Sequence, residues 1–130
     1  MNNFVRFQLP VLLWALLIFS LSSITKVPDL NKSDLPLDKV IHFIEYCLLG
    51  IFLLRGLFYR KEGHIRRMYI LYAIIIGVTI GICDEAYQYF VPNRDSNIFD
   101  LAADGLGVIF SVFIFQKFLK NDEIYRKYFS

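Results

Sequence analysis

Polar and ionisable side chains lie at one end of three of the apolar stretches in this chain. The second and fourth stretches begin with such side chains, and the third stretch ends with them. If successive stretches cross a membrane in alternating directions, all three of these ends lie at the same membrane face. In chain order they are Lys39, His42, Glu45, Asp84, Glu85, Gln88, Asp100 and Asp104. Charged groups near hydrocarbon are costly and mark a bundle interior, a cavity or a site. We therefore predict a polar site at one membrane face, which these residue types alone do not tie to one reaction.

Anion binding is one chemistry that these side chains allow. Arg94 follows the third stretch, and with Lys39 and a protonated His42 it could hold the phosphate of a lipid head group, because a guanidinium offers two parallel donors. The candidate ligand-binding residues are Lys39, His42, Asp84, Glu85, Gln88, Arg94, Asp100 and Asp104.

Acid–base or metal-assisted chemistry is a second candidate. Crowded carboxyl groups share protons, so one of them can serve as an acid. Carboxylate oxygens suit a hard cation such as Mg²⁺ or Ca²⁺, and an imidazole widens the choice of metal. The candidate catalytic residues are His42, Glu45, Asp84, Glu85 and Asp100. The candidate metal ligands are Asp84, Glu85, Asp100 and Asp104.

The absence of known catalytic motifs weighs against this second candidate. The segment HFIEY contains H-x-x-E but lacks the second histidine of a zinc-protease signature, and GxSxG, the P-loop and the dinucleotide fingerprint are absent. Cys47 and Cys83 do not have the spacing of a thiolate zinc site. Whether the protein is an enzyme stays open, and a divalent cation is the one cofactor that the residues suggest.

Two simpler interpretations need no ligand. In the first, Arg94 and the acidic residues form a structural network that fixes three helices and recruits a partner protein. In the second, Asp84, Glu85 and Asp100 are solvated at head-group depth, where charge costs little. The second interpretation is weaker for Asp104 and Glu45, which lie a turn or more deeper along their stretches.

The elements that must position these residues are four apolar stretches, each near the length that a membrane-spanning helix requires. They cover residues 7–24, 40–58, 68–90 and 98–119. We predict an all-α polytopic membrane protein, with the four helices forming one compact domain over residues 1–130. The first stretch also resembles a signal peptide, but its length and the three later stretches favour a retained helix. Asp38 is predicted to cap the second helix, and Asp95 or Ser96 the fourth.

Composition supports a membrane location. Of the 130 residues, 56% are hydrophobic, more than the usual globular share of about half. The net charge is only +2, whereas nucleic-acid-binding proteins carry a strongly basic surface, so the sequence does not suggest nucleic-acid binding. Four helices are few for a self-contained channel, so that function would require an oligomer, which the sequence leaves open.

Lysine and arginine predict the orientation. Nine of them flank the ends away from the polar side chains, and four flank the other ends. The nine are Arg6, Arg60, Lys61, Arg66, Arg67, Lys117, Lys120, Arg126 and Lys127, and the four are Lys26, Lys32, Lys39 and Arg94. The positive-inside rule then places both termini in the cytoplasm and the polar side chains at the outer face.

Helical spacing predicts which residues share a face. The stripes are Gly77, Gly81, Asp84 and Gln88 on the third helix, Asp100, Asp104, Gly107 and Ser111 on the fourth, and Lys39, His42, Tyr46 and Gly50 on the second. Gly77 and Gly81 form a GxxxG pattern, which lets membrane helices approach closely. We expect a tight bundle below a polar pocket, where Asp84, Glu85, Arg94 and Asp100 form one cluster with His42 beside it.

The segments DKVIHFIEYCLLG and DEAYQYFVPNRDSNIFDLAADGLG resemble the VanZ-like family of small bacterial membrane proteins. The resemblance covers about residues 36–112. Its matching residues are Lys39, His42, Tyr46, Asp84, Glu85, Gln88, Pro92, Arg94, Asp100, Asp104, Gly105 and Gly107. Members commonly have Asn at the position of Asp104, so the charge balance here differs.

That resemblance implies a bacterial plasma-membrane protein whose family is associated with glycopeptide resistance of the teicoplanin type. It favours an outer-face site for a cell-envelope precursor or a lipid head group. The partners expected are therefore the lipid bilayer and such an envelope component, without nucleic acid.

Overall fold

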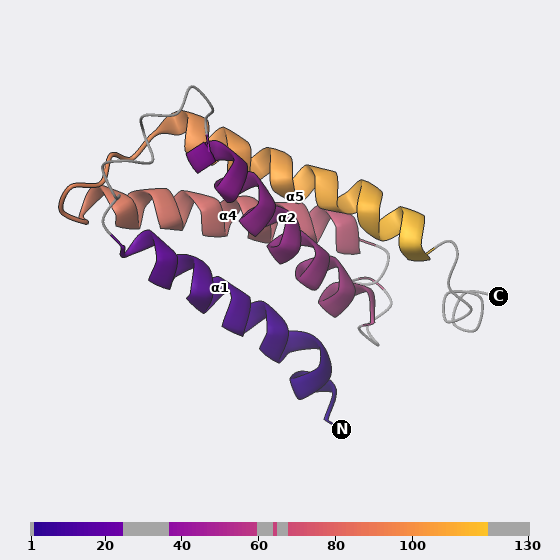
Figure 1. Cartoon of the computed structure of the whole chain (residues 1–130). Coiled ribbons are helices and arrows are strands. Elements are labelled where there is room, and N and C mark those ends of the chain that lie inside the picture. Colours follow the sequence, from indigo (N-terminus) through magenta and orange to yellow (C-terminus); the bar gives the residue numbers. More distant parts are fainter. Residues whose placement is uncertain (1, 25–36, 60–63, 65–67, 120–130) are drawn as a thin grey trace.

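The computed structural model describes residues 2–24, 37–59, 64 and 68–119, and the secondary structure within them is helical. A short π-helix precedes the first α-helix, and three longer α-helices follow (Figure 1). The elements are η1 (Phe4–Gln8), α1 (Leu9–Ser22), α2 (Leu37–Phe58), α4 (Tyr69–Tyr89) and α5 (Ile98–Leu119). Four helical segments in this part of the chain are long and apolar enough to cross a membrane, which confirms the predicted all-α membrane fold.

One helix start and two helix caps differ from the sequence prediction. The second helix begins at Leu37 rather than at residue 40, so Asp38 lies inside its first turn and is not a preceding cap. The fourth begins at Ile98, and its capping side chain is that of Asn97, whose Oδ1 accepts a hydrogen bond from the Phe99 amide at 2.9 Å. Neither Asp95 nor Ser96 caps it, because the Ser96 hydroxyl is bonded to Glu85 instead.

The π-helical turn before α1 has a local cause. Pro10 stands in the first turn of α1 and has no amide hydrogen for the carbonyl of Arg6. The Leu9 amide bonds the more distant Phe4 carbonyl, which widens the turn.

The helices alternate in direction along the bundle (Figure 1). The ends of α1 and α4 and the starts of α2 and α5 therefore meet at one end, which we call the polar end because it carries the ionisable side chains. The most extensive interface joins α2 and α5, whereas α1 lies more loosely on α2 and α4. One hydrogen bond ties α1 to α2, from Trp14 Nε1 to the Glu45 carbonyl at 2.9 Å.

Small residues set the close helix spacing. A Cβ at Gly107 would lie 3.0 Å from the backbone nitrogen of Cys47 and closer still to the Phe43 carbonyl, so α5 touches the backbone of α2 there. A Cβ at Gly77 would lie 2.8 Å from the Val108 side chain, so α4 also depends on a glycine to reach α5. The predicted tight packing of glycine stripes is thus confirmed for these two interfaces.

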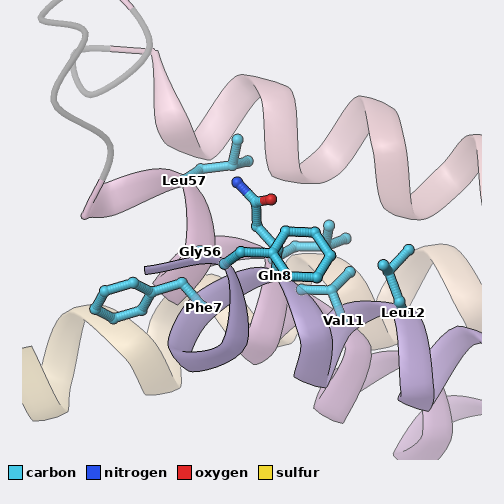
Figure 2. A pocket seen from close by; sticks show the side chains of 8 residues that line it. Phe7, Gln8, Val11, Leu12, Gly56 and Leu57 are labelled. Carbon is cyan, nitrogen blue, oxygen red and sulfur yellow. The ribbon is translucent and has the colours of Figure 1, made fainter. Parts of the chain in front are cut away.

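The opposite end of the bundle is apolar. Rings of Phe58, Tyr69 and Phe115 pack against one another there. Between η1 with the start of α1 and the end of α2 is a crevice lined by Phe7, Val11, Leu12, Leu57 and neighbouring residues, with Gln8 its polar side chain (Figure 2). This crevice lies far along α2 from His42 and lacks ionisable lining residues, so it is not the predicted polar site.

The orientation in the membrane stays a prediction. Among the described basic residues, Arg6, Arg55 and Lys117 belong to the apolar end, and Lys39 and Arg94 to the polar end. The other basic residues on which the prediction rests lie outside the described residues. These are Lys26, Lys32, Arg60, Lys61, Arg66, Arg67, Lys120, Arg126 and Lys127.

Candidate functional site

The polar end encloses a set of side chains that we call the polar cluster. Its members come from α1, α2, α4 and α5, and each is buried inside the protein. They are Ser22, His42, Asp84, Glu85, Gln88, Asp100 and Asp104. The exposed fractions of Asp84 and Asp100 are 0% and 1%, so these carboxyl groups are enclosed by helices and are not solvated at the surface.

The helical stripes predicted from spacing face the interior. Every member of the stripes on α4 and α5 is buried, namely Gly77, Gly81, Asp84, Gln88, Asp100, Asp104, Gly107 and Ser111. On α2, His42, Tyr46 and Gly50 are buried, while the Lys39 side chain is 38% exposed at the rim.

The centre of the polar cluster is a group of three ionisable residues from three helices. His42 Nδ1 on α2 and Asp104 Oδ1 on α5 lie 2.9 Å apart, at hydrogen-bond distance. Asp84 on α4 completes the group, because one ligand atom from each of the three residues lies within 4.8 Å of the others. A Cβ at Gly81 would lie 3.4 Å from Asp104 Oδ2, so the glycine on α4 gives this carboxyl group room.

A second group shares the same histidine. Lys39 Nζ lies 3.3 Å from Asp100 Oδ1 and forms an ion pair at the rim. Asp38, His42 and Asp100 also have ligand atoms within 4.8 Å of one another. His42 therefore stands between two pairs of aspartates, one deeper and one nearer the rim.

The two glutamates belong to neither of these groups. Glu85 Oε2 accepts hydrogen bonds from the Ser96 hydroxyl at 2.9 Å and from the Asn97 amide at 3.0 Å. Glu85 thereby fixes the segment that leads into α5, and it belongs to neither group that could hold a metal ion. Glu45 is half-buried, and its backbone carbonyl, rather than its carboxylate, receives the bond from Trp14.

Arg94 lies at the rim rather than in the interior. Its Nη1 donates to the carbonyl of Ile24, just after α1, at 3.0 Å. Its Nε is buried and has no hydrogen-bond partner among the described residues. The guanidinium is near enough to act electrostatically on Asp84 and Glu45. Arg94 thus closes one side of the polar cluster, and its guanidinium keeps N–H groups that can donate hydrogen bonds to a ligand.

Sequence reasoning missed the contribution of α1. The Ser22 hydroxyl accepts a hydrogen bond from Gln88 Nε2 at 3.2 Å, and the Ser23 and Tyr87 hydroxyls lie 2.8 Å apart. Ser22 is four residues after the buried Ile18, so both lie on the inward face of α1. That spacing could have identified Ser22, whereas the contact with Gln88 depends on the tertiary arrangement.

Several buried polar atoms at this end lack hydrogen-bond partners among the described residues. They are Tyr46 Oη, Asp84 Oδ1, Glu85 Oε1, Gln88 Oε1 and Asp104 Oδ2. The Tyr46 hydroxyl lies close to Asp84 without forming a hydrogen bond of good geometry. An unsatisfied buried polar group lowers the free energy of unfolding by about 1–3 kcal/mol, and in native proteins such groups are usually satisfied by water, an ion or a ligand.

Comparison with known proteins agrees with the resemblance found in the sequence. No curated protein and no solved structure matches the chain. The family model VanZ/LLP1 matches residues 3–120, which include all four spanning segments and the whole polar cluster. The chain is therefore a multi-pass membrane protein of the VanZ/LLP1 family.

Proposed function

We propose that this protein binds a phosphate-bearing cell-envelope precursor or lipid head group at the outer face of the bacterial plasma membrane. Through that binding it would contribute to glycopeptide resistance of the teicoplanin type. The observation that carries the proposal is the burial of His42, Asp84 and Asp104 at one end of an otherwise apolar bundle. Ionisable groups inside a membrane are costly, and a bundle held only by packing has no need of them.

The basic residues at the rim supply the anion contacts. Arg94 is bonded through Nη1 to a backbone carbonyl and keeps other donors, which suits recognition of a phosphate. Lys39 is partly exposed beside Asp100 and offers a second positive charge at the rim. A head group that enters from the membrane surface would meet these two cations before the acidic interior.

A structural network is the second candidate, and it too has support. Gln88 links α4 to Ser22 on α1, and Glu85 holds the segment before α5. These bonds join helices whether or not a ligand is present. In this candidate the polar cluster stabilises the bundle, or presents it to a partner protein, and has no small-molecule site. A membrane-embedded hydrolase or transferase would use the same residues and would also need a substrate with a bond to cleave. No observation on the described residues points to such a substrate.

Substitution of Arg94 separates the first two candidates. We expect Arg94→Gln to accumulate in the membrane, to remain folded and to lose the teicoplanin-resistance phenotype of cells that depend on this protein. Arg55→Gln is the matched control, because Arg55 is an exposed arginine at the apolar end and contacts the Phe7 ring. Its phenotype should equal that of the unchanged protein.

Other results would decide against the proposal. Breaking a buried charge network by removing one partner costs about 3–5 kcal/mol. If Arg94→Gln and Asp84→Asn both disappear from the membrane, the polar cluster is a structural network. If both variants accumulate and keep full resistance, the head-group site is refuted.

A further inference from the structure

The deepest three residues of the polar cluster have the arrangement of a metal-binding site. His42, Asp84 and Asp104 come from three different helices, and their exposed fractions are 3%, 0% and 0%. One donor atom of each lies within 4.8 Å of the other two. Because each helix supplies one ligand, the site depends on the bundle and not on a local sequence motif.

The distance between His42 Nδ1 and Asp104 Oδ1 suits a shared cation as well as a shared proton. Metal–ligand bonds to histidine nitrogen and carboxylate oxygen are about 2.0–2.2 Å long. Two such ligands are therefore about 3.4 Å apart at the tetrahedral angle of Zn²⁺ and about 3 Å apart at the right angle of an octahedral ion such as Mn²⁺. The observed 2.9 Å fits the right-angle arrangement.

Two buried carboxylate oxygens without hydrogen bonds in the described part of the chain are a second observation, separate from the distances, that points to a bound ligand. Asp84 Oδ1 and Asp104 Oδ2 are buried and have no hydrogen-bond partner among the described residues. Asp84 Oδ2 receives one bond, from Gln88 Nε2 at 3.2 Å, which orients the carboxyl group. A bound cation would satisfy these two oxygens, for which the described residues provide no hydrogen bond of good geometry.

The charges around these residues also favour a cation. Lys39 forms an ion pair with Asp100 at the rim, and Arg94 donates a hydrogen bond to the backbone carbonyl of Ile24. Neither forms an ion pair with Asp84 or Asp104 among the described residues. Two carboxylates in close proximity away from water are stabilised by a bound proton or by a compensating positive charge, and a divalent ion supplies two such charges.

We infer that His42, Asp84 and Asp104 bind one divalent cation. One imidazole nitrogen with two carboxylates suits Zn²⁺ or Mn²⁺ better than Mg²⁺ or Ca²⁺, which prefer oxygen ligands alone. The cation would also form a bridge between the acidic interior and a phosphate held by Arg94. That bridging role rests on the proposed function, whereas the cation site does not.

The test uses the full-length protein purified in detergent, stripped with a chelator and titrated with Zn²⁺ or Mn²⁺ alone. We expect about one equivalent of metal per chain by elemental analysis, and affinity lower by about tenfold or more in Asp84→Asn and Asp104→Asn. Asp95→Asn is the matched control, since Asp95 is an exposed carboxylate in the link between α4 and α5. Circular dichroism and size-exclusion chromatography verify that each variant is folded.

A spectroscopic measurement covers the case in which the aspartate variants fail to fold. Electron spin-echo modulation of Mn²⁺ bound to the unchanged protein should show an imidazole nitrogen, and His64→Ala should keep it because His64 is exposed and distant in sequence. Absence of stoichiometric metal, absence of the nitrogen signal, or equal affinity in folded Asp84→Asn and Asp95→Asn would overturn the site. Metal binding without any effect of Arg94→Gln on resistance would keep the site and reject the head-group function.

Discussion

Two glycines on α5 allow a matched test of how closely this bundle packs. At Gly107 an added Cβ would lie 3.0 Å from Cys47 N and 3.2 Å from the carbonyl carbon of Phe43. These are backbone atoms, which cannot rotate away as a flexible side chain could. At Gly105 an added Cβ would meet no atom within 4 Å. Gly107→Ala should therefore force α2 and α5 apart, and Gly105→Ala should not.

The magnitude follows from comparing the two substitutions. Each gains about the same helix propensity, up to about 1 kcal/mol for Ala over Gly. That gain cancels in the difference between the variants, which leaves the cost of overpacking at Gly107. Overpacking a tight contact costs about 1–3 kcal/mol. We expect Gly107→Ala to be less stable than Gly105→Ala by that amount.

Unfolding of the purified protein in mixed micelles with increasing sodium dodecyl sulfate, followed by circular dichroism, would measure this difference. A separation of α2 from α5 also draws His42 away from Asp104, so Gly107→Ala should weaken metal binding while Gly105→Ala should not. If Gly107→Ala unfolds at the same or a higher detergent fraction than Gly105→Ala, the close contact between α2 and α5 is wrong.

Two further predictions concern the orientation and the placement of α1. In a cysteine-free background, an impermeant thiol reagent added outside the cell should label Asn93→Cys and not Glu62→Cys, because the positive-inside rule places residue 93 outside; the reverse pattern would invert the topology. Trp14→Phe keeps an aromatic ring beside Phe52 but removes the donor to the Glu45 carbonyl. Interhelical hydrogen bonds in membranes contribute about 0.6 kcal/mol on average, so a loss near that value is expected in the same detergent titration, and no loss would show that this hydrogen bond does not stabilise the contact between α1 and α2.

The sequence by itself determined the four spans and the inward faces of three helices. Apolar length identifies a spanning helix because the bilayer core has a fixed thickness, and the 3.6-residue period assigns each side chain to a face. The burial of Gln88, four residues after Asp84, and of Ser111, four after Gly107, follows from that period. The length of a stretch is less informative about helix ends, which depend on local backbone geometry. Asp38 lies inside the first turn of α2 instead of capping it, and the side chain that caps α5 is that of Asn97.

Tertiary structure decided which polar residues meet. From the sequence, Asp84, Glu85, Arg94 and Asp100 formed the expected centre, with His42 beside it. In the structure His42 is itself central, and its closest acidic partner is Asp104, which lies one turn deeper than Asp100. Glu85 instead bonds the segment before α5.

The physical reason is the axial register between helices. Periodicity fixes the direction in which a side chain points, but not how far one helix is shifted along another. Here Gly107 fits against the backbone of α2 next to Phe43, the residue after His42, and thereby brings His42 level with Asp104. Gly81 leaves room for Asp104 beside α4, so Asp84 reaches the same level. Contacts between backbones, which the periodicity of a single helix does not encode, thus selected His42, Asp84 and Asp104 from the larger set of polar residues.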